Sequence, residues 1–208
     1  PHELRSPLTR IRMGLELMSG TATDPNALTR SRSEILRNMA ELDQLIDEIL
    51  LASRLDAKEA DIGTVEAVDL VGLCAEECAR VGAALEVPPG LSQLEVQGVA
   101  KLLRRMVRNL LENARRYGAH GDTHSAVVLS LGLDAGQTWL RVCDQGPGVP
   151  PAFRERIFEP FFRLPGASER IGGVGLGLSL VRSIAQRHSA HVVCEDRPEG
   201  GACFWVRF

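Results

Sequence analysis

The chain has 208 residues, which is enough for one ordinary domain and a smaller helical unit. Its hydrophobic fraction of 44% argues for a folded core and against disorder. Lysine and arginine number 24 against 27 aspartate and glutamate residues, a formal net charge of -3. The chain therefore lacks a global basic field, and we expect no nucleic acid as a direct partner.

The cysteine spacing and the hydropathy bear on whether the protein binds zinc, contains disulfides or crosses a membrane. Five cysteines are present, and they lack the paired CxxC spacing of a zinc site. We expect them to be reduced thiols in a cytosolic protein. No apolar run approaches the roughly 18 to 20 residues that a membrane-spanning helix needs.

Two amphipathic helices are predicted first. From Leu4 to Met18 the apolar residues alternate steps of four and three, which is typical of a coiled-coil or bundle seam. Residues 20–25 interrupt the pattern, and the same stepping returns from Leu28 to Ile49. Such a hairpin buries both stripes by pairing with a second copy in a four-helix bundle, so we predict a homodimer. Packing against the rest of its own chain is the alternative.

His2 lies beside this seam, so its ring is expected to reach solvent. The neighbouring Glu3 can accept a hydrogen bond from the ring and stabilise the positive charge that develops when the other nitrogen attacks a phosphorus atom. Pro7 predicts a bend just after this pair. Without such neighbours a helical histidine is usually only a surface residue.

The periodicity changes from about Thr64. A short strand is predicted over 65–70, a helix over 71–84 and a turn over 88–90. A broad apolar stripe at helical spacing follows from Val99 to Ala114. Asn109 and Asn113 lie on its other face, and because asparagine slightly disfavours a helix interior, their amides are expected to have a function. A solvated polar face is the alternative.

Alternating runs over 127–133 and 138–143 predict a β-hairpin, and Asp144 follows its second strand. An ionised carboxylate only accepts hydrogen bonds, so Asp144 can take the exocyclic amine of adenine and would repel the carbonyl of guanine. Gly146 and Gly148 would let the backbone approach the base closely. Taken alone, this segment could equally be a tight turn or a calcium loop.

Aromatic residues gather over 157–163, where we expect Phe158 and Phe161 to be scaffold. The loop over 164–171 is suited to a lid over a nucleotide.

Glycines at 173, 175 and 177 then lead into a helix, whose free N–H groups attract phosphate. This segment is neither a Walker loop nor a Rossmann fingerprint. A closing hairpin is predicted over 190–194 and 202–208.

Four motifs thus follow one another in the chain: His2-Glu3-Leu4-Arg5-Ser6-Pro7, Asn109-Leu-Leu-Glu-Asn113, Asp144-Gln-Gly146-Pro-Gly148 and Gly173-Val-Gly175-Leu-Gly177. The set resembles the catalytic core of bacterial sensor histidine kinases and covers nearly the whole chain. The resemblance implies an α+β architecture in two domains. Residues 1–62 would be an N-terminally truncated helical hairpin that forms a dimeric four-helix bundle. Residues 63–208 would be a Bergerat-type α/β sandwich with a mixed sheet, as in gyrase-type ATPases and Hsp90.

The same resemblance implies residue roles for a protein-histidine kinase that uses ATP and Mg²⁺. His2 would be the phosphoacceptor, Glu3 would assist the transfer, and Ser6 takes the place of the residue that orients water for dephosphorylating a partner regulator. Asn113 would ligate Mg²⁺ through its carbonyl oxygen with Asn109 in support. The remaining nucleotide contacts would be Arg116, Tyr117, Asp144, Gly146, Gly148, Arg163, Gly173, Gly175, Leu176 and Gly177.

The implied reaction is autophosphorylation of His2, in the same chain or its dimer mate, followed by transfer to an aspartate of a response regulator. The chain would be a cytoplasmic fragment, and the full-length protein would be anchored in the bacterial inner membrane through an N-terminal region missing here. Two alternatives stay open. One is a related ATPase or protein-serine kinase of the same nucleotide fold, and the other is a nucleotide-binding dimeric signalling module without turnover.

Overall fold

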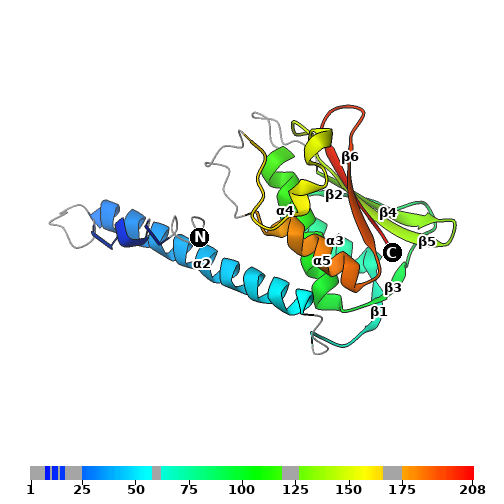
Figure 1. The fold of residues 1–208 in the computed structure, drawn as a ribbon, viewed down its shortest axis with the longest axis horizontal. Helices are drawn as coiled ribbons and strands as arrows, with labels where there is room; N and C mark the ends of the chain where they lie inside the picture. Colours follow the sequence, from blue (N-terminus) through cyan, green and yellow to red (C-terminus); the bar gives the residue numbers. More distant parts are fainter. Residues whose placement is uncertain are drawn as a thin grey trace. The chain divides into compact units, whose positions relative to one another are not determined.

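The computed structural model describes residues 8–9, 11–13, 15–16, 25–57, 62–118, 127–165 and 175–208. The chain divides into two compact units, Pro1–Leu51 and Ala52–Phe208. The elements run from α2 to β7 along the chain (Figure 1). No helix of the described residues has the length and apolar character needed to cross a membrane.

The predicted second helix is present as α2, Pro25–Asp56. Its exposed surface carries large apolar side chains separated by three, seven and four residues, which is the spacing of a bundle seam. These are Leu36, Met39, Ile46 and Leu50, with exposed fractions of 58%, 49%, 44% and 57%. The described residues between 8 and 16 are helical, as predicted for the first helix, and Leu8, Met13 and Leu15 are exposed there.

A five-stranded mixed sheet forms the centre of the second unit. Its strands are β2 (Ala84–Glu86), β4 (Val128–Asp134), β5 (Gln137–Cys143), β6 (His191–Asp196) and β7 (Ala202–Arg207). The order is β2-β4-β5-β7-β6; β2 pairs parallel with β4, and the other pairs are antiparallel. A separate two-stranded sheet joins β1 (Glu66–Asp69) to β3 (Glu95–Gly98).

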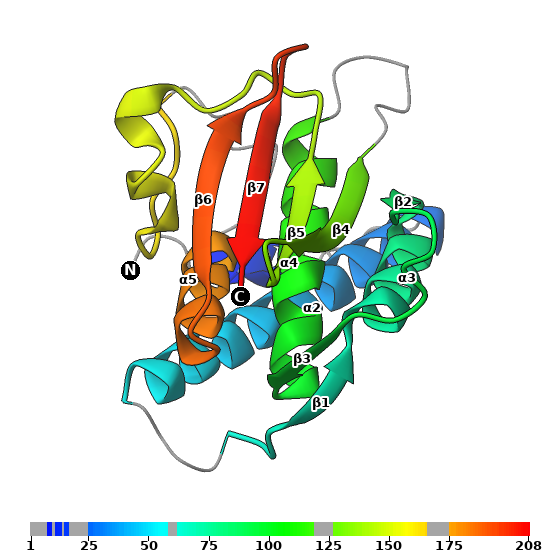
Figure 2. The ribbon, with the colours of Figure 1, turned by 90° about the vertical axis from the view of Figure 1, so that its right-hand side faces the viewer.

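Three helices cover one face of the sheet: α3 (Leu70–Val81), α4 (Ala100–Gly118) and α5 (Gly177–Arg187) (Figure 2). The core lies between these helices and the sheet, because the predicted apolar stripe of α4 is buried there and alternate residues of each strand face it. Its most buried members include Leu103, Met106, Leu110, Leu129, Leu140, Val142, Ile184, Phe204 and Val206. The expected helical region followed by a mixed α/β sandwich is therefore confirmed.

Two strands differ from the prediction. The sequence predicts only loop and turn between the helix over 71–84 and Val99, but β2 and β3 lie there. They are only three and four residues long, which is too short for a periodic pattern to be recognised, and in β2 no residue is buried. The predicted helix over 71–84 also ends earlier, because Gly82 adopts a left-handed conformation (φ 71°) and caps it.

The expectation of five reduced thiols is wrong for two of them. Cys143 and Cys203 form a disulfide between residues 60 positions apart in the sequence. The antiparallel pairing of β5 with β7 places them directly opposite each other, a proximity that spacing in the sequence cannot reveal. Cys74, Cys78 and Cys194 are free and buried.

A buried carboxylate joins α3 to α4. The side chain of Glu77 is 2% exposed. It accepts hydrogen bonds from Arg108 Nε and Nη2 at 3.0 and 2.8 Å, from Arg80 Nε at 3.0 Å and from Arg104 Nη1 at 3.3 Å. The hydrogen bonds from Arg108, followed by those from Arg80 and Arg104, lower the pKa of Glu77 to about 2 against the desolvation that raises it.

We expect Glu77→Gln to lower the free energy of unfolding by about 2 kcal/mol near neutral pH, because a buried charged acceptor of several hydrogen bonds is lost. In the wild type this contribution is present above the ordinary pKa of 4.5 and is lost as the pH falls toward about 2. Urea unfolding of both proteins across this range measures the difference. Glu76→Gln is the control, since its side chain is 66% exposed and changes stability by about 0.5 kcal/mol at most. Equal effects of the two substitutions would contradict the assignment.

Candidate nucleotide site

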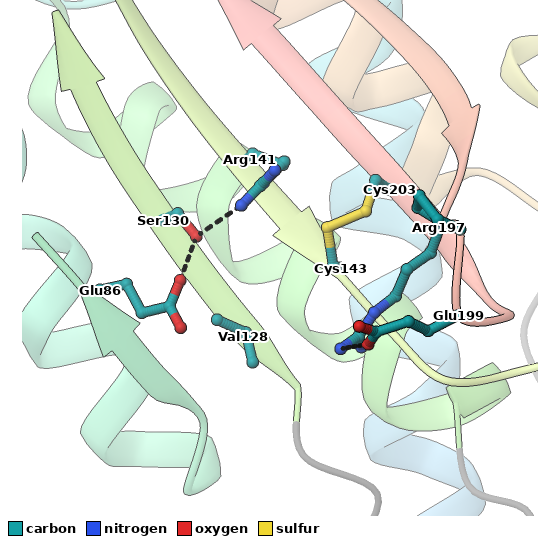
Figure 3. A pocket seen from close by; sticks show the side chains of 9 residues that line it. Glu86, Val128, Ser130, Arg141, Cys143, Arg197, Glu199 and Cys203 are labelled. Atoms are coloured by element: carbon teal, nitrogen blue, oxygen red, sulfur yellow. Dashed lines mark hydrogen bonds and ion pairs between the residues drawn. A yellow bond between two sulfur atoms is a disulfide. The ribbon is translucent and has the colours of Figure 1, made fainter.

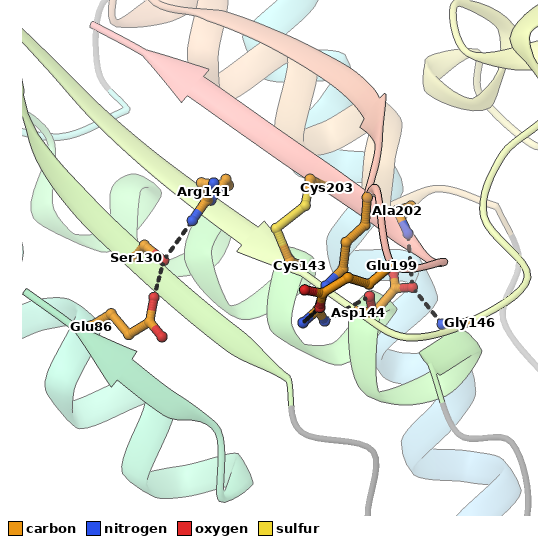
Figure 4. Close-up of a disulfide and its surroundings, with 10 residues drawn as sticks. Glu86, Ser130, Arg141, Cys143, Asp144, Gly146, Glu199, Ala202 and Cys203 are labelled. Atoms are coloured by element: carbon orange, nitrogen blue, oxygen red, sulfur yellow. Dashed lines mark hydrogen bonds and ion pairs between the residues drawn. A yellow bond between two sulfur atoms is a disulfide. The ribbon is translucent and has the colours of Figure 1, made fainter.

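Asp144 directly follows β5 and is 4% exposed. Its Oδ1 accepts hydrogen bonds from the backbone N–H of Gly146 at 2.9 Å and of Ala202 at 3.1 Å (Figure 4). Desolvation raises the pKa of this carboxyl, and the two backbone N–H donors and Arg197 oppose the rise. The carboxylate is thus held in one orientation, as a group that must recognise a ligand requires.

Glycines make the surroundings of Asp144 close-packed. A Cβ at Gly146 would overlap the backbone oxygen of Tyr117, and one at Gly118 would lie 2.9 Å from Asp144 Cβ. Gly148 has a φ of +75°, and a Cβ there would lie 3.1 Å from the backbone oxygen of Gly201. The end of α4 and the segment after β5 therefore approach each other at backbone distance, which side chains at these positions would prevent.

The two asparagines of α4 have different surroundings. Asn109 is 5% exposed, and its Nδ2 donates to the backbone oxygen of Gly177 at 3.2 Å. This hydrogen bond links α4 to the first residue of α5. Asn113 lies one turn further along α4 and is half-buried. Near the end of α4, Arg116 is exposed and Tyr117 is half-buried.

The start of α5 is shaped by Gly175, whose φ is +77°. Its carbonyl accepts a hydrogen bond from the N–H of Phe161 at 2.9 Å, and a Cβ there would lie 2.9 Å from Phe161 C. Leu176, which is buried, occupies the N-cap without a side-chain hydrogen bond. The first N–H groups of α5 lack partners in their own helix, so this end can accept phosphate oxygens.

The aromatic segment differs partly from its prediction. Phe158 is 3% exposed and packs edge-on against Phe204, with ring centroids 6.3 Å apart, which confirms it as scaffold. Phe161 is 53% exposed and has a φ of 63°, so the prediction that it is scaffold is wrong. Its backbone is bound to Gly175, which turns the side chain outward instead of into the core. Arg163 is half-buried.

Several predicted residues lie outside the described part of the chain. These are His2, Glu3, Ser6 and Gly173, together with most of the loop predicted as a lid. Within the described residues, no three His, Cys, Asp or Glu side chains gather as a metal site. The amide oxygen of Asn113 is a neutral oxygen of the kind that can bind magnesium beside substrate phosphates and water.

The sequence did not indicate how Asp144 is supported. Its backbone N–H donates to the oxygen of Ala202 at 2.9 Å, and Arg197 Nη1 donates to the backbone oxygen of Asp144 at 3.3 Å. A Cβ at Gly201 would overlap that same oxygen. The Gly200-Gly201 pair was visible in the sequence, but it predicted only the turn of the closing hairpin.

Two protein-family models match the chain. Residues 98–208 match the family described as "Histidine kinase-, DNA gyrase B-, and HSP90-like ATPase". Residues 1–58 match the "His Kinase A (phospho-acceptor) domain". The chain belongs to the two-component sensor histidine kinases.

One curated relative is longer than this chain. It is 36% identical over 208 residues to the sensor histidine kinase CpxA of Escherichia coli (strain K12), and the alignment covers 96% of this chain and 43% of CpxA. This histidine kinase chain thus spans less than half the length of that relative.

Solved structures of histidine kinases have the same fold. Full-length ShkA in complex with AMPPNP has a TM-score of 0.68 and 25% identity, and the match covers 99% of this chain and 43% of ShkA. ThkA in complex with the response regulator protein TrrA has a TM-score of 0.75 and 20% identity, covering 100% of this chain and 58% of that one.

Proposed function

We propose that this chain binds Mg-ATP in its second unit and transfers the γ-phosphoryl group to His2, and that the phosphoryl group then passes to an aspartate of a response regulator. The observation that carries the proposal is the oriented, buried carboxylate of Asp144, which lies beside the end of α4. The complex of the related ShkA with AMPPNP supports nucleotide binding, and that of ThkA with TrrA supports the regulator as partner.

The proposed roles follow from the chemistry of each group. Asp144 accepts the exocyclic amine of adenine, and Gly146 and Gly148 let the backbone pass close to the base. Asn113 offers an amide oxygen to magnesium, which neutralises charge on the phosphates. Asn109, whose amide is bound to Gly177, holds α4 and the start of α5 together.

The phosphate end of the nucleotide is assigned to residues from three parts of the chain. We place Gly173, Gly175, Leu176 and Gly177 against the phosphates through backbone N–H groups. Arg116 and Arg163 supply positive charge, and Tyr117 lies against adenine. The reaction needs little else, because phosphoryl transfer depends mainly on positioning and charge neutralisation.

The acceptor step uses the first motif. A ring nitrogen of His2 attacks the γ-phosphorus, the bond from that phosphorus to the β-γ bridging oxygen breaks, and ADP leaves. Glu3 accepts a hydrogen bond from the other ring nitrogen and stabilises the positive charge on the ring. Ser6 would orient water when the regulator is dephosphorylated.

The assembly and the location are also proposals. The exposed apolar seam of α2 supports a homodimer, because a second copy would bury it in a four-helix bundle. The domain boundary that we propose follows residue 62. We further propose that the chain acts in the cytoplasm as part of a protein anchored in the inner membrane.

Incubation with γ-labelled ATP and Mg²⁺ tests the function. We expect an acid-labile, alkali-stable label on the wild type and none on His2→Gln, which should keep its nucleotide affinity. Asn113→Ala should lose the label because magnesium and the phosphates are no longer held. His191→Gln, which replaces an exposed histidine on β6, is the control and should be labelled normally. Nucleotide binding without any label would favour the signalling module without turnover.

A further inference from the structure

The Cys143–Cys203 disulfide adjoins the residue that carries the proposed adenine contact. Cys143 is the last residue of β5 and directly precedes Asp144, and Cys203 directly follows Ala202 (Figure 4). The Cα atoms of the two cysteines are 4.1 Å apart. Asp144 and Ala202 exchange two hydrogen bonds, one through the backbone oxygen of Ala202 and one through Oδ1 of Asp144. The disulfide therefore bridges the same two strand ends that hold Asp144.

A cavity of about 290 Å³ reaches this disulfide. Residues alternate along β5, so Leu140 and Val142 face the helices and Cys143 faces the opposite side of the sheet. Both cysteines line the cavity there, and Arg141 and Arg197 flank them (Figure 3). The two cysteines are 7% and 6% exposed, and the cavity that they line gives a small molecule a route toward the disulfide from the face of the sheet opposite α3, α4 and α5.

The charges that line this cavity are balanced, which favours a neutral reagent. Two acidic residues, Glu86 and Glu199, line the cavity together with the two arginines and balance their charge. Ser130 Oγ donates to Glu86 at 2.9 Å and accepts from Arg141 at 3.3 Å, and Arg197 pairs with Glu199 at 3.3 Å. The guanidinium groups can also stabilise a departing thiolate.

The three free cysteines are poorly suited to exchange. Burial raises the pKa of Cys78 to about 11 and that of Cys194 to about 12, and it raises the pKa of Cys74 further. Since the thiolate is the reactive form, these thiols remain protonated and inert near neutral pH. The Cys143–Cys203 pair is therefore better suited to thiol–disulfide exchange than these three thiols.

We propose that Cys143–Cys203 is a thiol–disulfide exchange site for small neutral dithiols, and that its redox state sets the affinity of the chain for nucleotide. This inference rests on the proposed nucleotide-binding function. One thiolate of the dithiol attacks a sulfur of the bridge and the S–S bond breaks; the second thiol then attacks the mixed disulfide. Two cysteine thiols and one cyclic disulfide result, and the two protons and two electrons come from the dithiol.

Oxidation is the state that favours nucleotide binding. With the bridge formed, the register of β5 against β7 is locked beside Asp144. After reduction no covalent bond joins these ends, and hydrogen bonds such as those of Asp144 with Ala202 and Arg197 hold them together. Gly200 and Gly201, which precede β7, have no side chains and both have positive φ. The hydrogen bond from Ala202 to Asp144 then opens more often. A cytoplasmic location fits this role, because disulfides that form there are commonly redox-sensing.

The test compares nucleotide affinity of the chain in its oxidised form and after treatment with dithiothreitol, with thiols counted in each sample. We expect two additional thiols and an affinity for a fluorescent ATP analogue that is about fivefold weaker, as for one lost hydrogen bond. The double variant Cys143→Ala, Cys203→Ala should have the nucleotide affinity of the reduced form, and the dithiol should not change that affinity. Cys194→Ala, the control, should respond like the wild type.

Two results would overturn the inference. One is equal affinity in both states despite the two additional thiols, which would leave nucleotide binding itself intact. The other is a bridge that the dithiol fails to open in the folded protein. Absence of nucleotide binding in both states would instead refute the proposed function, and this inference with it. Thermal unfolding of the double variant shows whether it is folded before its affinity is compared.

Discussion

Asp144→Asn should weaken ATP binding by about 30-fold to 100-fold, the loss expected for a hydrogen bond to a charged group. The asparagine oxygen can still accept from the N–H groups of Gly146 and Ala202, so the fold should persist. Its amide nitrogen is a donor, however, and cannot accept the amine of adenine. Isothermal titration of both proteins with ATP measures the change.

Nucleotide selectivity separates this role from a structural one. An asparagine can donate to the carbonyl of guanine, so the ratio of ATP to GTP affinity should fall in the variant. In the wild type, affinity for ATP should also decline as the pH falls through the raised pKa of Asp144, above its ordinary value of 3.8. Asp134→Asn, at the exposed last residue of β4 opposite Gln137 of β5, is the control. An unchanged ATP to GTP ratio would refute the assigned contact.

Gly201→Ala should lower the free energy of unfolding by about 3 kcal/mol or more, because backbone strain and a steric overlap add together. Gly201 has a φ of +110°, and a Cβ there would overlap the backbone oxygen of Asp144. The β5 end must move to relieve the overlap, so nucleotide affinity should fall as well. Urea unfolding and ATP titration measure the two effects.

Gly200→Ala provides a matched control for this substitution. Gly200 also has a positive φ, +93°, but a Cβ there would meet nothing within 4 Å. We expect only the strain of the left-handed region, about 1 kcal/mol, and a nucleotide affinity close to that of the wild type. If the two alanine variants proved equally stable and bound ATP equally, the close packing of Gly201 on Asp144 would be wrong.

Much of the scaffold is predictable from local patterns. The apolar stripe from Val99 to Ala114 predicts α4, since its period matches the helix and all its members are buried. The turn at Asp134-Ala-Gly136 predicts the β4–β5 hairpin, where Ala135 and Gly136 both have positive φ. The exposure of Phe161 cannot be predicted from a local pattern. Its outward direction follows from a backbone hydrogen bond to Gly175, fourteen positions away in the sequence.

The sequence by itself determined the order of the motifs, the helices and the β4–β5 hairpin, and with them the family, because these depend on residues a few positions apart. Only the tertiary structure decided what surrounds Asp144. Ala202, Gly201 and Arg197 reach it from more than fifty positions away, and Cys143 meets Cys203 across the same pair of strands. Pairing between distant strands creates these contacts, and the spacing of residues along the chain does not predict which strands pair.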